Sequence, residues 1–506
     1  MKVLVIVIVI FLFCRFLRLH SVSIDEIQRE NFRRNLKLVH LSLSRNNIDH
    51  IPNGTFVDLK SLDYLGISSN SIASVTPGMF VGLSALKRLD LDRNRIKSID
   101  FDALNSLVQL SLTNNMIETL DSNSFTHLTK LEKLDLDGNA LATIHSDAFK
   151  GLHNLHSLKL SRNRLIELPR GIFSTLYRLE DLDLSGNMIS KIDSETFVHL
   201  YRLRSLDLAG NQITILNSTI FKGLENLNTL YLDENKIHTI EQDTFYSLKR
   251  LQNLYLAQNQ LASIQVSTFI RSHSLRILKL GKNKLTEIED YTFLHLNQLI
   301  DLNLNENKLR ALRKNTFVGL RNLRMLYIHN NYLESISEES FSSMAYLEYL
   351  ELFGSNMKCS CLYIKTLKSL NTETLLADCR NVHGGYQIPT MLQPISYDFT
   401  PWVMLADCET GWCNPGLYMR TVMCWSCKQT NSPLCTHFTV QDCILMVYEK
   451  HFRNNAQGGM ECHSLACGDC KKGNEKSSEK NNSDGRNVMH MFQWISMLLV
   501  QVYNQQ

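Results

Sequence analysis

Carboxylates and tyrosines recur at a fixed spacing through the middle of the 506-residue chain. Asp183, Asp207, Tyr231 and Tyr255 follow one another at intervals of 24 residues. Carboxylates can act as acids or bases, and beside aromatic side chains they are typical of surfaces that bind proteins. Because each stands in a separate copy of one pattern, we expect these residues to bind a ligand and not to catalyse a reaction. The predicted ligand-binding residues are Asp90, Asp92, Asp135, Asp137, Asp181, Asp183, Asp207, Tyr231, Asp233 and Tyr255.

Motifs of known enzyme classes are absent from the sequence. It contains no H-E-x-x-H, no G-x-S-x-G, no phosphate-binding loop and no dinucleotide fingerprint. We therefore expect that the chain is not an enzyme and that residues 409–470 do not conceal one. The formal net charge is only +3, without a basic stripe or an acidic tail, so we also expect no nucleic-acid partner.

Cysteine is confined almost entirely to one region. Twelve of the 13 cysteines lie between Cys359 and Cys470, and residues 38–344 contain none. An even, clustered set indicates an oxidising compartment and disulfides. Two C-x-x-C pairs within residues 424–470 have the ligand types of a tetrahedral zinc site, but disulfides suit a secreted chain better. We expect no metal and no cofactor.

The residues named above are positioned by a repeat with the pattern L-x-x-L-x-L-x-x-N, of which residues 131–154 are a clear copy. All intervals between copies are 24 residues except the one from Leu86 to Leu107, which is 21. A fixed period of this length is typical of a solenoid. The copies open at Leu38, Leu62, Leu86, Leu107, Leu131, Leu155, Leu179, Leu203, Leu227, Leu251, Leu275, Leu299 and Leu323, and a half-copy opens at Leu347.

Within a copy, the alternation of apolar and polar residues predicts a short strand with one buried face. Leu134 and Leu136 point inward, and the residues between them point outward. Asn139 ends the strand, where its amide can satisfy buried backbone groups of neighbouring coils. A phenylalanine such as Phe149 recurs on the return side and predicts a packed spine. The 21-residue copy lacks three residues of the return side, so we expect a local change of curvature or spine packing there and no domain break.

The repeat and the cysteines that follow it resemble those of extracellular leucine-rich repeat proteins over about residues 38–408. The resemblance implies an α/β solenoid, a right-handed horseshoe with a parallel β-sheet on its concave face, followed by a small disulfide-rich region. Cys359-Ser-Cys361, Cys379 and Cys408 are similar to the C-terminal cap of that family. The resemblance implies bonds of Cys359 with Cys379 and of Cys361 with Cys408. The pairing of the eight later cysteines stays open among 105 combinations.

The register of the repeat extends backwards from Leu38. Residues 14–37 fit one more, degenerate copy, with Leu17 and Leu19 on the strand and Phe32 in the phenylalanine column. This fit conflicts with a secretory signal, which the apolar run 3–13 indicates. Cleavage after Ser23 would remove the strand and leave 24–37 as a cap, whereas a very short signal would end near Cys14. We favour the first interpretation.

The predicted organisation is therefore a series of seven segments. It comprises a signal peptide 1–23, a degenerate repeat or cap 24–37, leucine-rich repeats 38–346, a C-terminal cysteine-rich cap 347–408, a cysteine-rich module 409–470, a disordered linker 471–487 and an apolar tail 488–506. The tail resembles a glycolipid-anchor signal, and an amphipathic terminal helix is the alternative. Predicted glycosylation sites are Asn53, Asn217 and Asn481.

These features predict a secreted protein, or one on the extracellular face of the plasma membrane. Its concave face would bind an extracellular or cell-surface protein that carries a basic patch. The alternative for the aspartates is that they only keep the surface soluble. The alternative for the whole chain is a structural matrix protein that binds collagen-like or proteoglycan components, which affinity for a fixed tissue scaffold would reveal.

Overall fold

The structure is a computed structural model, and it describes residues 14–101, 104–122, 124–357, 367, 370, 372–380 and 387–392. All of them belong to the first of two compact units, Met1–Pro415. The predicted module 409–470, linker 471–487 and tail 488–506 lie outside the described residues, and so do residues 1–13 of the predicted signal.

A 17-stranded sheet connects the coils. Successive strands pair in parallel and in register, as Leu182 does with Leu206 and Leu206 with Leu230. Strand order therefore follows chain order, and only the last pair is antiparallel. The strands are β1 (Phe16–Arg18), β2 (His40–Ser42), β3 (Tyr64–Gly66), β4 (Arg88–Asp90), β5 (Gln109–Ser111), β7 (Lys133–Asp135), β9 (Ser157–Lys159), β10 (Asp181–Asp183), β11 (Ser205–Asp207), β13 (Thr229–Tyr231), β15 (Asn253–Tyr255), β16 (Ile277–Lys279), β17 (Asp301–Asn303), β19 (Met325–Tyr327), β21 (Tyr349–Glu351), β22 (Thr374–Arg380) and β23 (Gln387–Leu392).

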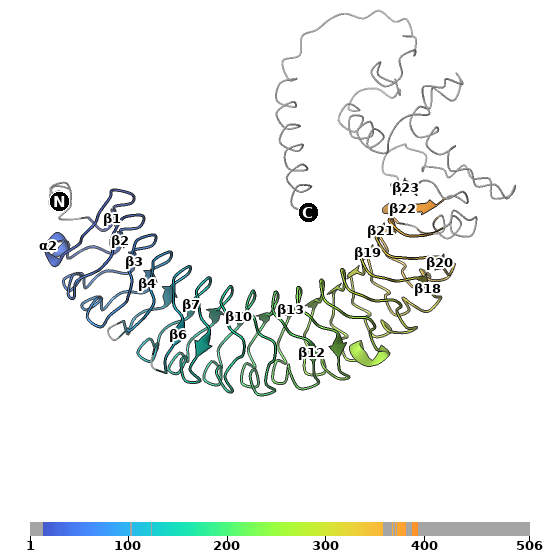
Figure 1. Cartoon of the computed structure of the whole chain (residues 1–506), viewed down its shortest axis with the longest axis horizontal. Coiled ribbons are helices and arrows are strands. Elements are labelled where there is room, and N and C mark those ends of the chain that lie inside the picture. Colours follow the sequence, from blue (N-terminus) through green and yellow to red (C-terminus); the bar gives the residue numbers. More distant parts are fainter. Residues whose placement is uncertain are drawn as a thin grey trace, which may run out of the picture. The chain divides into compact units, whose positions relative to one another are not determined.

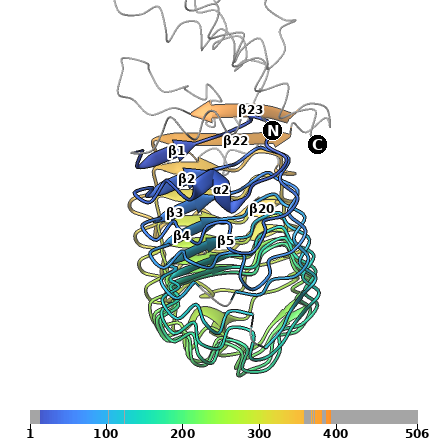
Figure 2. The ribbon, with the colours of Figure 1, turned by 90° about the vertical axis from the view of Figure 1, so that its left-hand side faces the viewer.

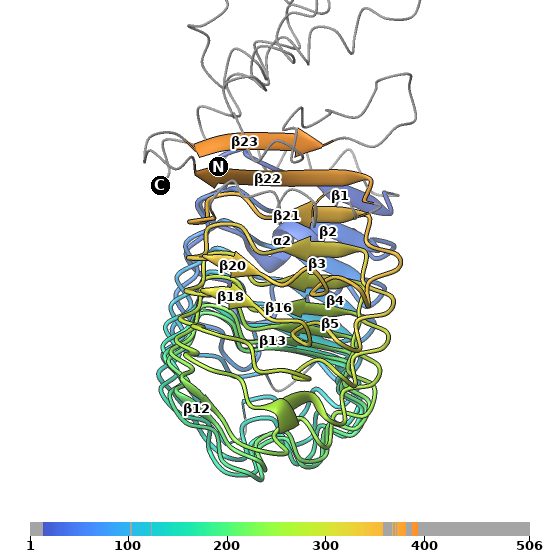
Figure 3. The same cartoon turned by 90° about the vertical axis from the view of Figure 1, so that its right-hand side faces the viewer.

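The coils curve into an arc with this sheet on its inner side (Figure 1). End-on views show the strands crossing the arc, with β1 above β2 at one end and β21 below β22 at the other (Figure 2, Figure 3). The outer side consists mainly of turns. Its regular elements in the described residues are the strand pairs β6 (Thr119–Leu120) with β8 (Thr143–Ile144), β12 (Ile215–Leu216) with β14 (Thr239–Ile240) and β18 (Ala311–Leu312) with β20 (Ser335–Ile336), the helix α2 (Arg29–Phe32) and the 3-10 helix η1 (Val266–Phe269). The predicted solenoid with a concave parallel sheet is confirmed.

The asparagine column holds neighbouring coils together as predicted. The Nδ2 group of Asn139 donates to the carbonyl oxygen of Leu112 in the preceding coil at 2.9 Å and to that of Leu136 in its own coil at 3.0 Å. Its Oδ1 atom accepts from the amide of Ile117 at 3.1 Å. Each asparagine thus satisfies backbone groups that the strand-ending turn leaves buried. Without these bonds the turns would carry unpaired polar groups into the core.

The phenylalanine column forms the predicted spine, and it includes one member that the fixed 24-residue spacing did not reveal. The rings of Phe149 and Phe173 stack with centroids 6.2 Å apart. In the 21-residue copy Phe101 fills the column, 6.3 Å from Phe80 and 6.5 Å from Phe125. The sheet also stays in register there, with Leu89 opposite Leu110. The shorter copy therefore causes no break, as expected.

The N-terminal coil confirms the backward extension of the register. Strand β1 pairs in parallel with β2, and Leu17, Ile27 and Phe32 are buried. Val22 takes the place of the column asparagine in this coil, and Asn46 of the next coil donates to the carbonyl oxygen of Leu19 at 2.8 Å. Cleavage after Ser23 would remove β1 and uncover the edge of β2. The cleavage site itself stays a prediction.

At the other end, the described part of the predicted cap prolongs the sheet. Strand β22 pairs in parallel with β21, and β23 runs antiparallel to β22. Leu367, Leu375 and Ala377 are buried. Cys379 lies on β22, whereas Cys359, Cys361 and Cys408 fall outside the described residues, so the two implied disulfides stay predictions.

Candidate functional site on the strand face

The predicted ligand-binding residues form ladders on the solvent side of the inner sheet. Asp183 lies opposite Asp207, Asp207 opposite Tyr231, and Tyr231 opposite Tyr255. Adjacent strands in a sheet are roughly 4.8 Å apart, so these side chains are immediate neighbours. The structure thus brings together residues that the sequence separates by a full repeat. In the same ladder, Ser111 separates Asp90 from Asp135, and Lys159 separates Asp135 from Asp183.

Four aspartates of the strands have a structural role that the alternation of residues did not predict. Each carboxylate accepts a hydrogen bond from the backbone amide two residues further on, where the strand ends. In Asp183 the Oδ1 atom lies 2.9 Å from the amide nitrogen of Ser185. The same bond is made by Asp90, Asp135 and Asp207. These side chains are partly exposed, and they also bind the backbone where the strand ends.

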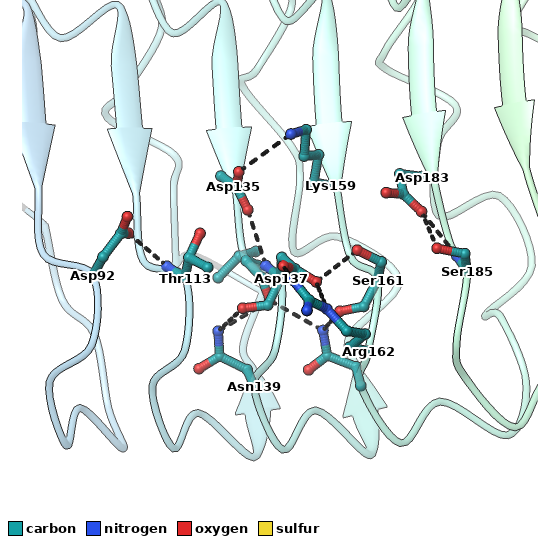
Figure 4. Close-up of polar contacts among 12 residues, drawn as sticks. Asp92, Thr113, Asp135, Asp137, Asn139, Lys159, Ser161, Arg162, Asp183 and Ser185 are labelled. Atoms are coloured by element: carbon teal, nitrogen blue, oxygen red, sulfur yellow. Dashed lines mark hydrogen bonds and ion pairs between the residues drawn. The ribbon is translucent and has the colours of Figure 1, made fainter. Parts of the chain in front are cut away.

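The aspartates two residues beyond the strand ends, Asp92, Asp137 and Asp233, connect neighbouring coils (Figure 4). Asp92 accepts from the Oγ of Ser111 at 2.5 Å and from the amide of Thr113 at 2.8 Å. Asp233 accepts from the amide of Ala257 at 2.7 Å. These carboxylates therefore stabilise the stack of coils as well as facing the solvent.

The middle of the acidic tract, at Asp135 and Asp137, is neutralised by basic residues of the following coil (Figure 4). The carboxylate of Asp137 is 10 % exposed and forms a short ion pair with Arg162. Burial opposes its ionisation, but the hydrogen bonds from Arg162 and Ser161 outweigh burial and lower its pKa. The Nζ of Lys159 lies 3.7 Å from Asp135. Asp135 and Asp137 thus offer little free negative charge to a ligand.

Within the described residues, the C-terminal part of the tract lacks such basic partners. No ion pair to Asp183, Asp207 or Asp233 occurs in the described part of the chain. Burial raises the pKa of Asp207, and the carboxylate of Asp183 adds to the rise. Burial, with the nearby carboxylates of Asp207 and Glu234, raises the pKa of Asp233 to about 6. Asp207 and Asp233 are poorly solvated and have no ion-pair partner among the described residues, so a cation from outside would stabilise them.

Two tyrosines border this carboxylate row. The rings of Tyr231 and Tyr255 stack with centroids 4.7 Å apart and planes inclined by 15°. Both side chains remain partly exposed. Stacking holds them in one orientation, so little side-chain entropy remains to be lost when they contact a partner. We call Asp183, Asp207, Asp233, Tyr231 and Tyr255 the acidic-aromatic site.

Sequence reasoning missed two further clusters on the same face. Near the C-terminal end, Lys279 binds Asp301 at 2.6 Å and lies 5.1 Å from the centre of the Tyr327 ring. Near the N-terminal end, His40 stacks on Tyr64 at 4.3 Å. These residues occupy the same columns as the predicted ones. Reading the columns to both ends of the array would have found them.

The carboxylates do not converge as catalytic or metal-binding groups do. They stand one or two to a coil, and the described residues contain no group of three His, Cys, Asp or Glu side chains suited to hold a metal ion. Among those residues, no helix has the length and hydrophobicity needed to cross a lipid bilayer. Of the predicted glycosylation sites, Asn53 is exposed and Asn217 partly exposed on the outer side, and Asn481 falls outside the described residues.

The family follows from the match of the repeats. The leucine-rich repeat model matches residues 15–72, 63–117, 105–165, 153–213, 202–261, 249–309, 273–333 and 298–357. The chain belongs to the leucine-rich repeat family. This repeat architecture generally serves as a binding scaffold. None of the curated proteins matches the chain.

Solved leucine-rich repeat structures share the fold. The TLR13 chain of a TLR13–ssRNA13 complex is 27% identical with a TM-score of 0.61, and the match covers 72% of this chain and 50% of that one. A leucine-rich repeat protein of Leptospira interrogans is 28% identical with a TM-score of 0.61, with 71% and 88% covered. The Toll–Spatzle complex of Drosophila shows likeness of fold alone, at 23% identity, a TM-score of 0.55 and coverage of 68% and 50%. The chain spans about half the length of the TLR13 and Toll chains that it matches.

Proposed function

We propose that the chain is an extracellular recognition protein without enzymatic activity, which binds a protein ligand or receptor through the acidic-aromatic site. The observation that supports this most is the row of poorly solvated carboxylates without a counter-charge beside two stacked tyrosines. A basic side chain of a partner would supply the missing counter-charge, and the tyrosines would provide apolar contact area. The fold relatives include a Toll chain solved with Spatzle, which agrees with protein recognition by this architecture.

The partner is expected to present a basic patch with an apolar centre. Charge steers such a partner to the site, so the association rate should fall as salt is added. The tyrosines should contribute mainly to the lifetime of the complex, because apolar contacts at a buried centre slow dissociation. The neutralised pair Asp135 and Asp137 should contribute little to either.

A binding experiment with matched variants tests the proposal. The full chain is used to capture surface and secreted proteins, in parallel with Asp183→Asn/Tyr231→Ala. The control is Asp147→Asn/Tyr246→Ala, which changes the same residue types at exposed positions of the return segments. A partner retained by the control and lost by the site variant supports the proposal. A partner retained equally by both variants would place binding elsewhere.

The extracellular location is a further part of the proposal. It is supported by the apolar run 3–13 and by the confinement of cysteine to residues outside the repeats. Expression in cultured cells tests it, since the glycosylated protein should reach the medium or the cell surface. If the tail 488–506 directs a glycolipid anchor, a phosphoinositide-specific phospholipase should release the protein. Retention inside the cell would contradict the proposal.

A further inference from the structure

A second binding surface lies beside the sheet, on the flank where the chain enters the strands. There a groove of about 810 Å³ crosses successive coils from β10 to β16. Its lining residues adjoin the opening leucines of the repeats and belong to none of the ladders of the acidic-aromatic site. Three arginines and three amide side chains form most of it: Arg202, Arg204, Arg250, Asn226, Asn228 and Gln252.

The groove carries free positive charge. Glu180 is its only acidic lining residue, and it lies 3.5 Å from the Nε of Arg204. Arg202 and Arg250 are exposed, and neither side chain has an ion pair or a hydrogen bond in the described part of the chain. They stand two coils apart, which is roughly 10 Å at the spacing of adjacent strands. Two unpaired guanidinium groups therefore face one elongated space.

The chemistry of the lining selects among anionic ligands. A guanidinium group binds tetrahedral oxyanions and carboxylates through paired N–H groups. The amides, with hydroxyls such as Ser205 and Thr229, can donate to and accept from sugar hydroxyls. No aromatic side chain lines the groove, whereas proteins that hold single-stranded nucleic acid stack its bases on aromatic rings.

We propose that this groove binds a sulfated polysaccharide of the glycosaminoglycan type, with Arg202 and Arg250 each contacting a sulfate or carboxylate group. The charge of the acidic-aromatic site also favours the flank over the inner face as the surface that binds a polyanion. In β11, Arg204 precedes the strand and Asp207 ends it, so the carboxylates repel a polyanion from the inner face while the flank attracts it. This site is independent of the proposed protein-binding function.

The test measures binding of a heparin-derived hexasaccharide to the full-length chain. Replacing both free arginines, Arg202→Gln/Arg250→Gln, should weaken binding by about tenfold or more, since hydrogen bonds to charged groups are lost. The control is Arg164→Gln/Arg310→Gln, which removes the same charge from exposed arginines that follow the strand-ending asparagines. The control should change affinity by less than about twofold. Asp183→Asn/Tyr231→Ala should leave this affinity intact.

Three results would overturn the proposal. They are equal binding of a chemically desulfated hexasaccharide, equal loss in the two arginine variants, and tighter binding of a single-stranded oligonucleotide of the same charge. The last result would assign the groove to nucleic acid. Because all substituted arginines are exposed, unchanged melting midpoints are expected and confirm that each variant is folded.

Discussion

Asp233 offers a direct test of the electrostatics assigned to the strand face. Its carboxylate has a pKa of about 6, above the ordinary 3.8, because burial and neighbouring carboxylates disfavour the charge. A group whose pKa is raised by folding contributes its stability below the unfolded pKa and loses it as pH rises through the folded pKa. The folded protein should therefore lose stability between pH 4 and pH 6 on account of this residue, and Asp233→Asn should abolish that loss.

The size of the effect follows from the pKa shift. A rise of roughly two units corresponds to about 3 kcal/mol at neutral pH if the full shift appears as stability. The carboxylate is partly exposed, and solvent screening reduces this to roughly 1–2 kcal/mol. Asparagine keeps an oxygen that can accept from the amide of Ala257, so the substitution removes charge without removing the hydrogen bond. Asp233→Asn should thus be more stable than the natural protein at pH 7.5 and nearly equal to it at pH 4.

Denaturant unfolding of both proteins at the two pH values measures the difference. Stability in a repeat array is a sum of local terms, so hydrogen exchange of the amide of Ala257 gives a second, local measurement. The exposed residue Asp147 supplies the control, because Asp147→Asn should shift stability equally little at both pH values. The reasoning is refuted if Asp233→Asn destabilises the protein at pH 7.5 or has the same effect at pH 4.

Three further predictions concern the scaffold. Asn187→Ala should cost about 1–3 kcal/mol in the free energy of unfolding, because Leu160 and Leu184 lose their amide donor; unchanged denaturant midpoints would contradict this. Phe197→Ala should cost about 3–5 kcal/mol and lower the melting midpoint, since its ring is fully buried. Arg162→Gln should lower the free energy of unfolding by roughly 1–2 kcal/mol at pH 7. The arginine lowers the pKa of Asp137, so their interaction stabilises the folded protein at pH values above the ordinary pKa of an aspartate. That cost should shrink as pH falls below about 4 in acid-unfolding measurements.

The sequence predicted the scaffold well because each of its columns has one physical task. Leucines at every second position predict a strand with one buried face, and an asparagine at the strand end predicts the turn that follows. Both predictions hold whatever residues stand between the leucines. The prediction weakened where the period changed. Phe101 was not predicted as part of the spine, because it does not follow Phe80 at the 24-residue interval, yet the shortened copy keeps its ring in the stack.

The binding face was predicted less completely, for a different reason. Alternation identifies which side chains face the solvent, but it does not say what those side chains contact. Asp137 and Asp183 look equivalent in the sequence, yet Arg162 neutralises the first and no cation pairs with the second in the described residues. The arginine reaches across from the following coil, so the difference depends on a contact between repeats. The flanking groove likewise combines positions from several coils, and no motif within one repeat marks it.

The parallel stacking of the coils explains how one chain can present surfaces of opposite charge side by side. All strands enter the sheet along one flank, so residues that precede the strand, such as Arg204, accumulate there. Residues at the strand ends, such as Asp207, accumulate on the inner face instead. The outward-facing columns can vary more freely than the leucine, asparagine and phenylalanine columns, which form the core of every coil. Both proposed sites lie where these outward-facing columns change along the array, between β10 and β16.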